Sequence, residues 1–105
     1  MAGFEWRNKT FHADDVNVRK IYDVLNNDCE HPSFYLYSKS TILSNIHGYT
    51  DALKALTVTS FLGFSMKANC NPSILEIFRE SGCTAIVVSG HEVLLALKCG
   101  FSSDR

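Results

Sequence analysis

Apolar residues recur at helical spacing in two stretches of the first half of the chain. Over residues 14–26 they stand at positions i, i+3, i+4 and i+7, which predicts a short amphipathic helix with Asp14, Asp15 or Asn17 as its N-cap. Over residues 40–56 they alternate at steps of four and three, which predicts a longer helix with one buried face. Each helix needs a neighbour against which its apolar stripe can pack.

A run of aromatic residues separates these two helices. Pro32 stops helical structure, and residues 34–37 (F-Y-L-Y) have the length and composition of a strand, which Ser38 closes. We expect Tyr35 and Tyr37 to serve packing in this strand. The first part of the chain is therefore predicted to hold a helix followed by a strand.

The second half begins with a largely apolar run at 61–66, which is followed by the polar loop 67–72. Asn71 as N-cap and Pro72 at the first helical position then predict a helix, and Gly82 ends it. Strand, loop and helix thus follow one another in order.

The same order repeats at once. Residues 85–88 are wholly apolar and mostly β-branched, as in strands buried on both faces of a parallel sheet. Ser89 and Glu92 have the S-x-x-E spacing of a capping box, residues 93–97 supply an apolar helical face, and Gly100 is a C-terminal cap. Two consecutive βα units are therefore predicted.

Such units define an α/β fold with a parallel sheet covered by helices, either doubly wound or closed into a barrel. A chain of 105 residues falls well short of the ~250 residues of a closed barrel. Because the predicted second helix ends near the C-terminus, the third strand is missing and an apolar sheet edge is left open. We expect the chain to be cut short.

Composition and charge narrow the class of protein. Hydrophobic residues make up 46% of the chain and charged residues 20%, which is ordinary for a globular protein and excludes a disordered or collagen-like one. The net charge is −1, and neither a basic stripe nor an acidic block favours nucleic acid or a membrane surface as a partner. No apolar run approaches the ~18 residues of a membrane span.

The cysteines and histidines lack the spacing of a metal site, so no zinc is expected. Residues 1–15 contain acidic residues and no apolar core, unlike a signal peptide or a typical transit peptide. We therefore expect reduced thiols in a soluble, intracellular protein. Plastid and cytoplasm both stay open, because a transit peptide could lie upstream.

Lys67 is the candidate for chemistry, because the carboxyl ends of parallel strands are where βα folds gather their functional groups. A lysine there can act as a Schiff-base nucleophile, since an apolar strand and a nearby helix N-terminus disfavour its charged form. Position alone favours a simpler interpretation, in which the side chain extends from a strand end into water.

The sequence of the surrounding segments favours Lys67 as a Schiff-base lysine. Residues 64–69 (F-S-M-K-A-N) resemble the Y-A-x-K-A-N signature around the cofactor lysine of the fold-type III, or alanine-racemase-like, pyridoxal-phosphate enzymes. Residues 34–39 (F-Y-L-Y-S-K) resemble a strand of the diaminopimelate decarboxylases, notably those of plant type. Further matches follow at 71–75, 81–83, 87–93 and 96–101, so the resemblance covers roughly residues 32–101 in order.

Several positions depart from the family pattern. Ile86 stands where many members carry an aspartate, which removes one acidic partner of the cofactor lysine, although plant-type sequences also tend to be apolar there. Phe64 and Ser65 replace tyrosine and alanine, and Ser33 is an insertion before the aromatic run. None of these changes excludes activity.

Other polar residues near the lysine have competing interpretations. Glu92 matches a glutamate near the cofactor in related decarboxylases, but the capping box already gives it a structural role, which we favour. Asn69 is a candidate for orienting the lysine loop, and His91 is expected to face solvent. We expect the three cysteines of this half to be packing residues: Cys70, Cys83 and Cys99.

The resemblance implies the start of a (β/α)8 barrel, with Lys67 after its first strand and pyridoxal 5'-phosphate as cofactor. Residues 1–39 would hold the N-terminal helix and the aromatic strand, which joins a separate C-terminal β domain, and residues 40–105 would start the barrel. The cofactor site would include Lys67, Asn69 and Glu92. The resemblance also implies a homodimer whose active sites lie at the subunit interface.

The implied reaction is decarboxylation of meso-2,6-diaminopimelate to L-lysine. The phosphate-binding loop and the substrate-binding residues are expected downstream, so we expect this chain alone to be inactive. Another fold-type III enzyme, such as an ornithine or arginine decarboxylase or a racemase, shares the lysine segment and stays an alternative. So does a truncated, non-catalytic protein that binds cofactor or a partner.

Overall fold

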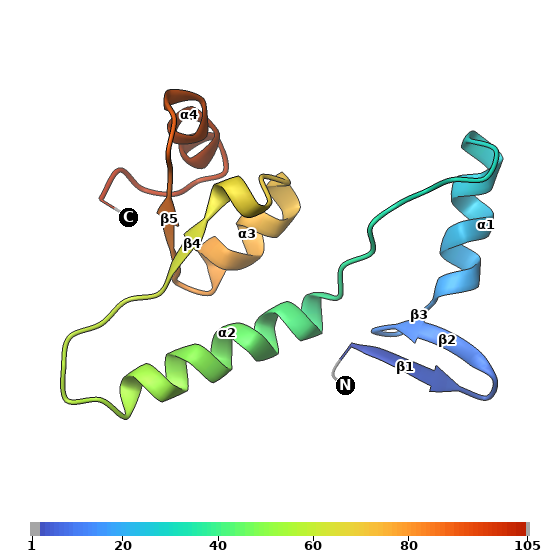
Figure 1. Ribbon diagram of the computed structural model, residues 1–105, viewed down its shortest axis with the longest axis horizontal. Helices are drawn as coiled ribbons and strands as arrows, with labels where there is room; N and C mark the ends of the chain where they lie inside the picture. The colour runs from blue at the N-terminus through green and yellow to red at the C-terminus, as the bar shows by residue number, and fades with distance from the viewer. Residues whose placement is uncertain (1–2, 105) are drawn as a thin grey trace. The chain divides into compact units, whose positions relative to one another are not determined.

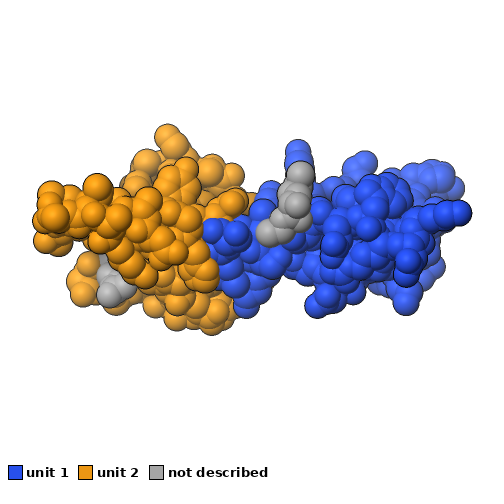
Figure 2. All heavy atoms as spheres, turned by 90° about the horizontal axis from the view of Figure 1, so that it is seen from below, with its two compact units in different colours: residues 1–44 blue, residues 45–105 orange. Residues whose placement is uncertain are grey.

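The computed structural model describes residues 3–104 and divides into two compact units, 1–44 and 45–105 (Figures 1 and 2). The division falls inside helix α2 (Lys39–Lys54). The expected ranges 1–39 and 40–105 include residues 1, 2 and 105, which lie outside the described residues. Each unit is described by itself.

The first unit opens with an antiparallel sheet that the apolar pattern did not predict. Its strands are β1 (Phe4–Arg7), β2 (Thr10–Ala13) and β3 (Val16–Asn17), in that order. Asn8 and Lys9 form a two-residue hairpin loop, and both have positive φ, as a type I′ turn requires. Stacking of aromatic rings on one face accompanies the pairing, because Phe11 packs against rings of β1 at 5.3 and 6.0 Å.

Helix α1 (Val18–Asp28) confirms the first predicted helix, although it begins later than expected. Of the three candidate caps, Asn17 is the one that acts, since its Oδ1 accepts a hydrogen bond from the Arg19 N–H at 2.8 Å. The residues before it instead form the turn between β2 and β3. A strand pairing thus occupies the positions that the periodicity assigned to the first helical turn.

The predicted aromatic strand is wrong. Residues 32–38 have neither helix nor strand, and none of them pairs in a β-ladder with any described residue. Tyr35 is 91% exposed and Tyr37 is 53% exposed, so the expected packing role is wrong as well. An aromatic run favours a strand only where a neighbouring strand can bond its backbone, and the described part of the chain supplies none here.

The second unit contains the two predicted βα units. Strand β4 (Gly63–Ser65) leads through the short 3₁₀ helix η1 (Met66–Ala68) to α3 (Pro72–Glu80), and β5 (Thr84–Ile86) leads to α4 (Gly90–Lys98). The strands pair in parallel and lie side by side in Figure 1. The predicted strands, helices and parallel pairing are confirmed, with strands shorter than the apolar runs.

The core of this unit lies between the sheet and its two helices. Its buried members are Met66, Leu75, Ala96 and Phe101. Phe64 packs against this cluster and also stacks on Phe78 of α3, with ring centroids 3.8 Å apart. Side chains alternate between the two faces of a strand, so Phe64 of β4 points toward the core, whereas Gly63 and Ser65 lie on the other face of the sheet.

Gly63 lies close to a side chain of the neighbouring strand. A Cβ there would lie 2.7 Å from Cδ1 of Ile86 on the neighbouring strand. A side chain at position 63 would therefore require the half-exposed Ile86 side chain to move. Within residues 3–104, no helix has the length and apolar character needed to cross a membrane.

Candidate active site

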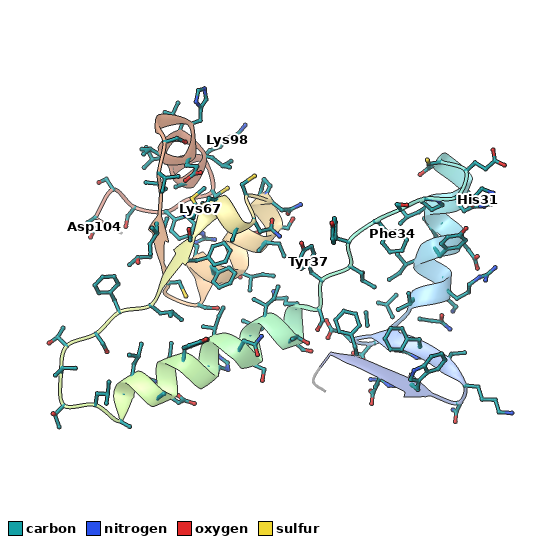
Figure 3. All side chains as sticks on the ribbon, viewed as in Figure 1. His31, Phe34, Tyr37, Lys67, Lys98 and Asp104 are labelled. Atoms are coloured by element: carbon teal, nitrogen blue, oxygen red, sulfur yellow. The ribbon has the colours of Figure 1, made fainter. Side chains whose placement is uncertain are left out.

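Lys67 lies in η1, directly after strand β4 (Figure 3). The preceding Met66 is completely buried and anchors the turn, whereas Lys67 is exposed. Its amine has no hydrogen-bond or ion-pair partner among residues 3–104. No described carboxylate therefore pairs with this amine, and the amine is accessible to a ligand.

The loop after Lys67 is fixed by two side-chain amides. Asn69 Oδ1 accepts a hydrogen bond from the Asn71 N–H at 3.0 Å, and Asn71 Oδ1 accepts one from the Ser73 N–H at 3.0 Å. Asn71 caps α3 and Pro72 fills its first turn, as the sequence predicts. Both bonds lie in the short loop that connects the lysine turn to α3.

The loop after β5 is fixed by the predicted capping box. Ser89 Oγ accepts a hydrogen bond from the Glu92 N–H at 3.2 Å, and Glu92 Oε2 accepts one from the Val88 N–H at 2.8 Å. The return bond thus reaches the residue before the cap rather than the cap itself. His91 is exposed, as expected.

The parallel pairing places these two loops at the same end of the sheet. Ser65 pairs in register with Ile86, so the turn with Lys67 and the loop that leads to Glu92 in the first turn of α4 both leave the carboxyl ends of neighbouring strands. The Nδ2 atom of Asn69 and the Oε1 atom of Glu92 have no partner among the described residues. A primary amine, an amide donor and a carboxylate oxygen are therefore available at this end.

The three cysteines of the second unit differ in their surroundings. Cys83 is buried, and burial raises the pKa of its thiol, while Cys99 is partly buried against the core. Cys70 is exposed in the loop after Lys67, so the expectation that it packs is wrong. Within residues 3–104, no three His, Cys, Asp or Glu residues are grouped as metal ligands.

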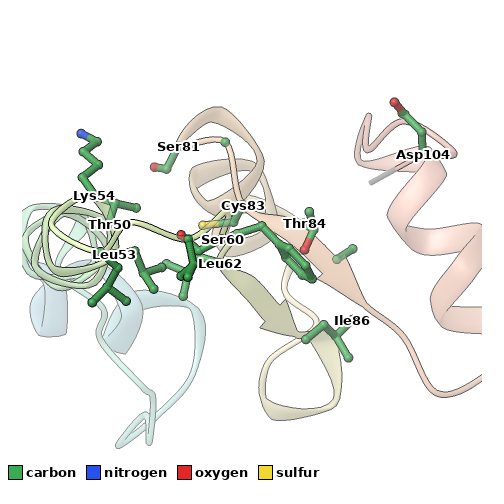
Figure 4. A pocket seen from close by; sticks show the side chains of 15 residues that line it. Thr50, Leu53, Lys54, Ser60, Leu62, Ser81, Cys83, Thr84, Ile86 and Asp104 are labelled. Atoms are coloured by element: carbon green, nitrogen blue, oxygen red, sulfur yellow. The ribbon is translucent and has the colours of Figure 1, made fainter.

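A hollow of about 950 Å³ lies beside β5, the end of α2 and the segment before β4 (Figure 4). Its lining includes Lys54 of α2, Phe61 before β4, and Cys83 and Thr84 at the start of β5. Lys67, Asn69 and Glu92 are not among the lining residues. The hollow is therefore separate from the lysine turn.

A polar cluster in the first unit was missed by sequence reasoning. Asp14, expected as a cap of α1, accepts hydrogen bonds from the hydroxyls of Ser40 at 2.5 Å and Ser38 at 2.7 Å, at the start of α2. These bonds, from Ser40 and then Ser38, lower the pKa of the Asp14 carboxyl. The partners lie more than twenty residues apart, and no local pattern connects them.

The fold and this site define an α/β protein with an accessible lysine at the carboxyl end of a parallel strand. No protein-family model matches the chain. Individual proteins do match it, and the curated relatives are diaminopimelate decarboxylases. The chain is homologous to part of these enzymes.

The probable chloroplastic diaminopimelate decarboxylase of Oryza sativa subsp. japonica is 46% identical over 76 residues, which are 72% of this chain and 15% of that protein. Diaminopimelate decarboxylase of Zymomonas mobilis is 30% identical and matches all of this chain, but the match is 24% of its own length. The chain thus spans only a minor part of the relatives that it matches.

A solved structure shows the same fold. The diaminopimelate decarboxylase from m. jannaschi matches 92% of this chain and 22% of its own, with a TM-score of 0.68 and 21% sequence identity. The chain therefore has the α/β arrangement of the corresponding part of that enzyme.

Proposed function

We propose that this chain is the amino-terminal part of a longer decarboxylase, the parent enzyme, that converts meso-2,6-diaminopimelate to L-lysine. The observation that carries the proposal is the placement of Lys67 at the carboxyl end of a parallel strand, in a chain 46% identical over 76 residues to the rice protein named above. Its two βα units would begin a (β/α)8 barrel. Pyridoxal 5'-phosphate would be the cofactor.

The residues present fit this cofactor. Its aldehyde needs a primary amine that can lose its proton, and Lys67 offers one that no described carboxylate pairs. When bound, the cofactor supplies an electron sink for the electrons that stay on the substrate when carbon dioxide leaves. The protein's own part is to hold the group and to orient it.

Lys67 would hold the cofactor covalently through Nζ. Asn69 and Glu92 would border the cofactor from the two neighbouring loops, where Asn69 Nδ2 and Glu92 Oε1 lack protein partners among the described residues. The buried Met66 before the lysine and the capping bonds after it would keep both loops in place. Rigid support of this kind is what an orienting site requires.

The remaining residues needed for catalysis would come from the rest of the parent enzyme. The chain spans 15% of the rice relative and 24% of the Zymomonas mobilis relative. We propose that residues 1–39 and residues 40–105 contribute to two domains of the parent enzyme, that it works as a homodimer, and that the 105-residue chain is inactive alone.

Release of carbon dioxide from meso-2,6-diaminopimelate by the parent enzyme tests the proposal. We expect turnover that requires added pyridoxal phosphate, is abolished in Lys67→Ala, and is retained in Lys98→Ala, a control at an exposed lysine on α4. Turnover of ornithine or arginine instead, or racemisation, would assign another fold-type III activity. A parent that binds the cofactor without any turnover would contradict the enzymatic role.

A further inference from the structure

The turn that carries Lys67 is held between two buried anchors. Met66 on one side and Leu75 on the other are both completely buried in the same cluster. The chain between them must place an exposed lysine while it reverses from β4 into α3 (Figure 3). The conformation of this short loop therefore determines where the lysine amine can lie.

Asn69 stabilises that conformation at its middle. The residue has extended backbone (φ −161°, ψ 115°), and its Oδ1 accepts a hydrogen bond from the N–H of Asn71, two residues on, at 3.0 Å. Such a side-chain bond substitutes for a backbone turn. Asn71 then repeats the arrangement toward Ser73, so the two asparagines connect η1 to α3 in one continuous series of bonds.

The two polar atoms of Asn69 allow two different roles. The oxygen is engaged within the loop, whereas the nitrogen has no partner among the residues that the structure describes. If the oxygen is the important atom, Asn69 affects Lys67 indirectly, through the backbone conformation of the loop. If the nitrogen is the important atom, it must contact a bound group directly. Substitutions can separate the two roles, because aspartate or serine keeps an acceptor without the nitrogen, whereas glutamine keeps the amide but moves its oxygen away from the Asn71 N–H.

We infer that Asn69 is a positioning residue, whose side-chain oxygen fixes the turn that presents Lys67. This inference rests on the proposed function and deepens it. The asparagine serves the cofactor site through the bond from the Asn71 N–H to its oxygen. Its amide nitrogen would lie beside the cofactor but is not required for turnover. Misplacement of the amine relative to the cofactor is the expected consequence of losing that bond.

Four variants of the parent enzyme test the inference. Asn69→Asp and Asn69→Ser keep a short acceptor and lose the nitrogen, Asn69→Gln keeps the amide but is too long for the two-residue turn, and Asn69→Ala loses both. Asn17→Ala is the matched control, because Asn17 Oδ1 also accepts a backbone hydrogen bond, at 2.8 Å, but in the first unit. The readouts are kcat, KM and the pH dependence of the visible absorption of the bound cofactor.

We expect Asn69→Ala and Asn69→Gln to lower kcat, by up to about 10²-fold, and to change the pH dependence of the absorption. The Asp and Ser variants should recover most of the loss, and Asn17→Ala should leave kcat and the absorption unchanged. The inference would be overturned if Asn69→Ala had the kcat and the absorption of the wild type. It would also be overturned if Asn69→Gln were fully active while Asn69→Asp and Asn69→Ser both lost activity.

The positioning role of Asn69 can be wrong even if the proposed function is right. If the wild type carries cofactor on Lys67 and the Ala variant is normal, only the positioning role is lost. If the wild type carries no cofactor on Lys67, the proposed function fails and the positioning role fails with it. Far-ultraviolet circular dichroism of each variant shows whether a loss reflects unfolding.

Discussion

Replacing Ser89 with alanine removes one half of the capping box beside the candidate site. The Ser89 hydroxyl accepts a hydrogen bond from the Glu92 N–H at 3.2 Å, near the long end of the usual range, and the residue is exposed. Loss of an N-cap costs about 0.5–2 kcal/mol. The long, exposed bond places Ser89→Ala in the lower half of that range, at about 0.5–1 kcal/mol of unfolding free energy.

Urea denaturation of the parent enzyme measures this cost, with Ser89→Asp as the control that keeps an acceptor at the cap. We expect Ser89→Ala to lower the transition midpoint without a change of slope, Ser89→Asp to restore it, and kcat to change little in either variant. Glu92→Gln should also change the urea midpoint and kcat only slightly, because the amide oxygen can still accept the hydrogen bond from the Val88 N–H.

A collapse of activity in Ser89→Ala with unchanged stability would refute this reasoning. It would mean that the hydroxyl acts on a ligand rather than on the helix. The same outcome in Glu92→Gln would give the charge of Glu92 a direct role at the cofactor.

Three further predictions concern the rest of the chain. Leu75→Ala should lower the unfolding free energy of the parent enzyme by about 3 kcal/mol, because Leu75 is completely buried, whereas Leu94→Ala, at a 67% exposed position, should cost under ~0.5 kcal/mol in the same urea titration. Because the pKa of Asp14 is lower in the folded protein than its ordinary value of 3.8, the ionised carboxylate stabilises the first unit at pH values above 3.8. This stabilisation is lost as the pH falls through the pKa of the folded state. Asp14→Asn should therefore make acid unfolding, followed by Trp6 fluorescence, less steep. The 105-residue chain alone should aggregate or bind hydrophobic dyes and release no carbon dioxide, and a monodisperse monomer with cooperative unfolding in size-exclusion and light-scattering experiments would contradict this.

Local signals account for the parts of the fold that the sequence predicts. Asn71 and Pro72 are adjacent in the chain, and Ser89 and Glu92 are three residues apart, so these caps and the helices that they begin can be predicted from spacing alone. The position of Lys67 after a strand is predictable for the same reason, since strand, loop and helix are consecutive.

Non-local pairing accounts for the parts that the sequence does not predict. Strands β1 and β2 are only four residues long each, and so short an alternation of aromatic and polar residues is a weak signal for a hairpin. The bonds of Asp14 to Ser38 and Ser40 depend on tertiary structure, and so does the absence of a strand at 34–37. The sequence predicts Asn69 as a candidate residue, but the hydrogen bond from the Asn71 N–H to its side chain depends on the backbone conformation of the loop.

The identity of the lysine that carries the cofactor tests the central claim most directly. Borohydride reduction of the parent enzyme with bound pyridoxal phosphate, followed by peptide mapping, should find the phosphopyridoxyl group on Lys67, and Lys67→Arg should lose it. A group on another lysine, or none at all in an active enzyme, would contradict the account.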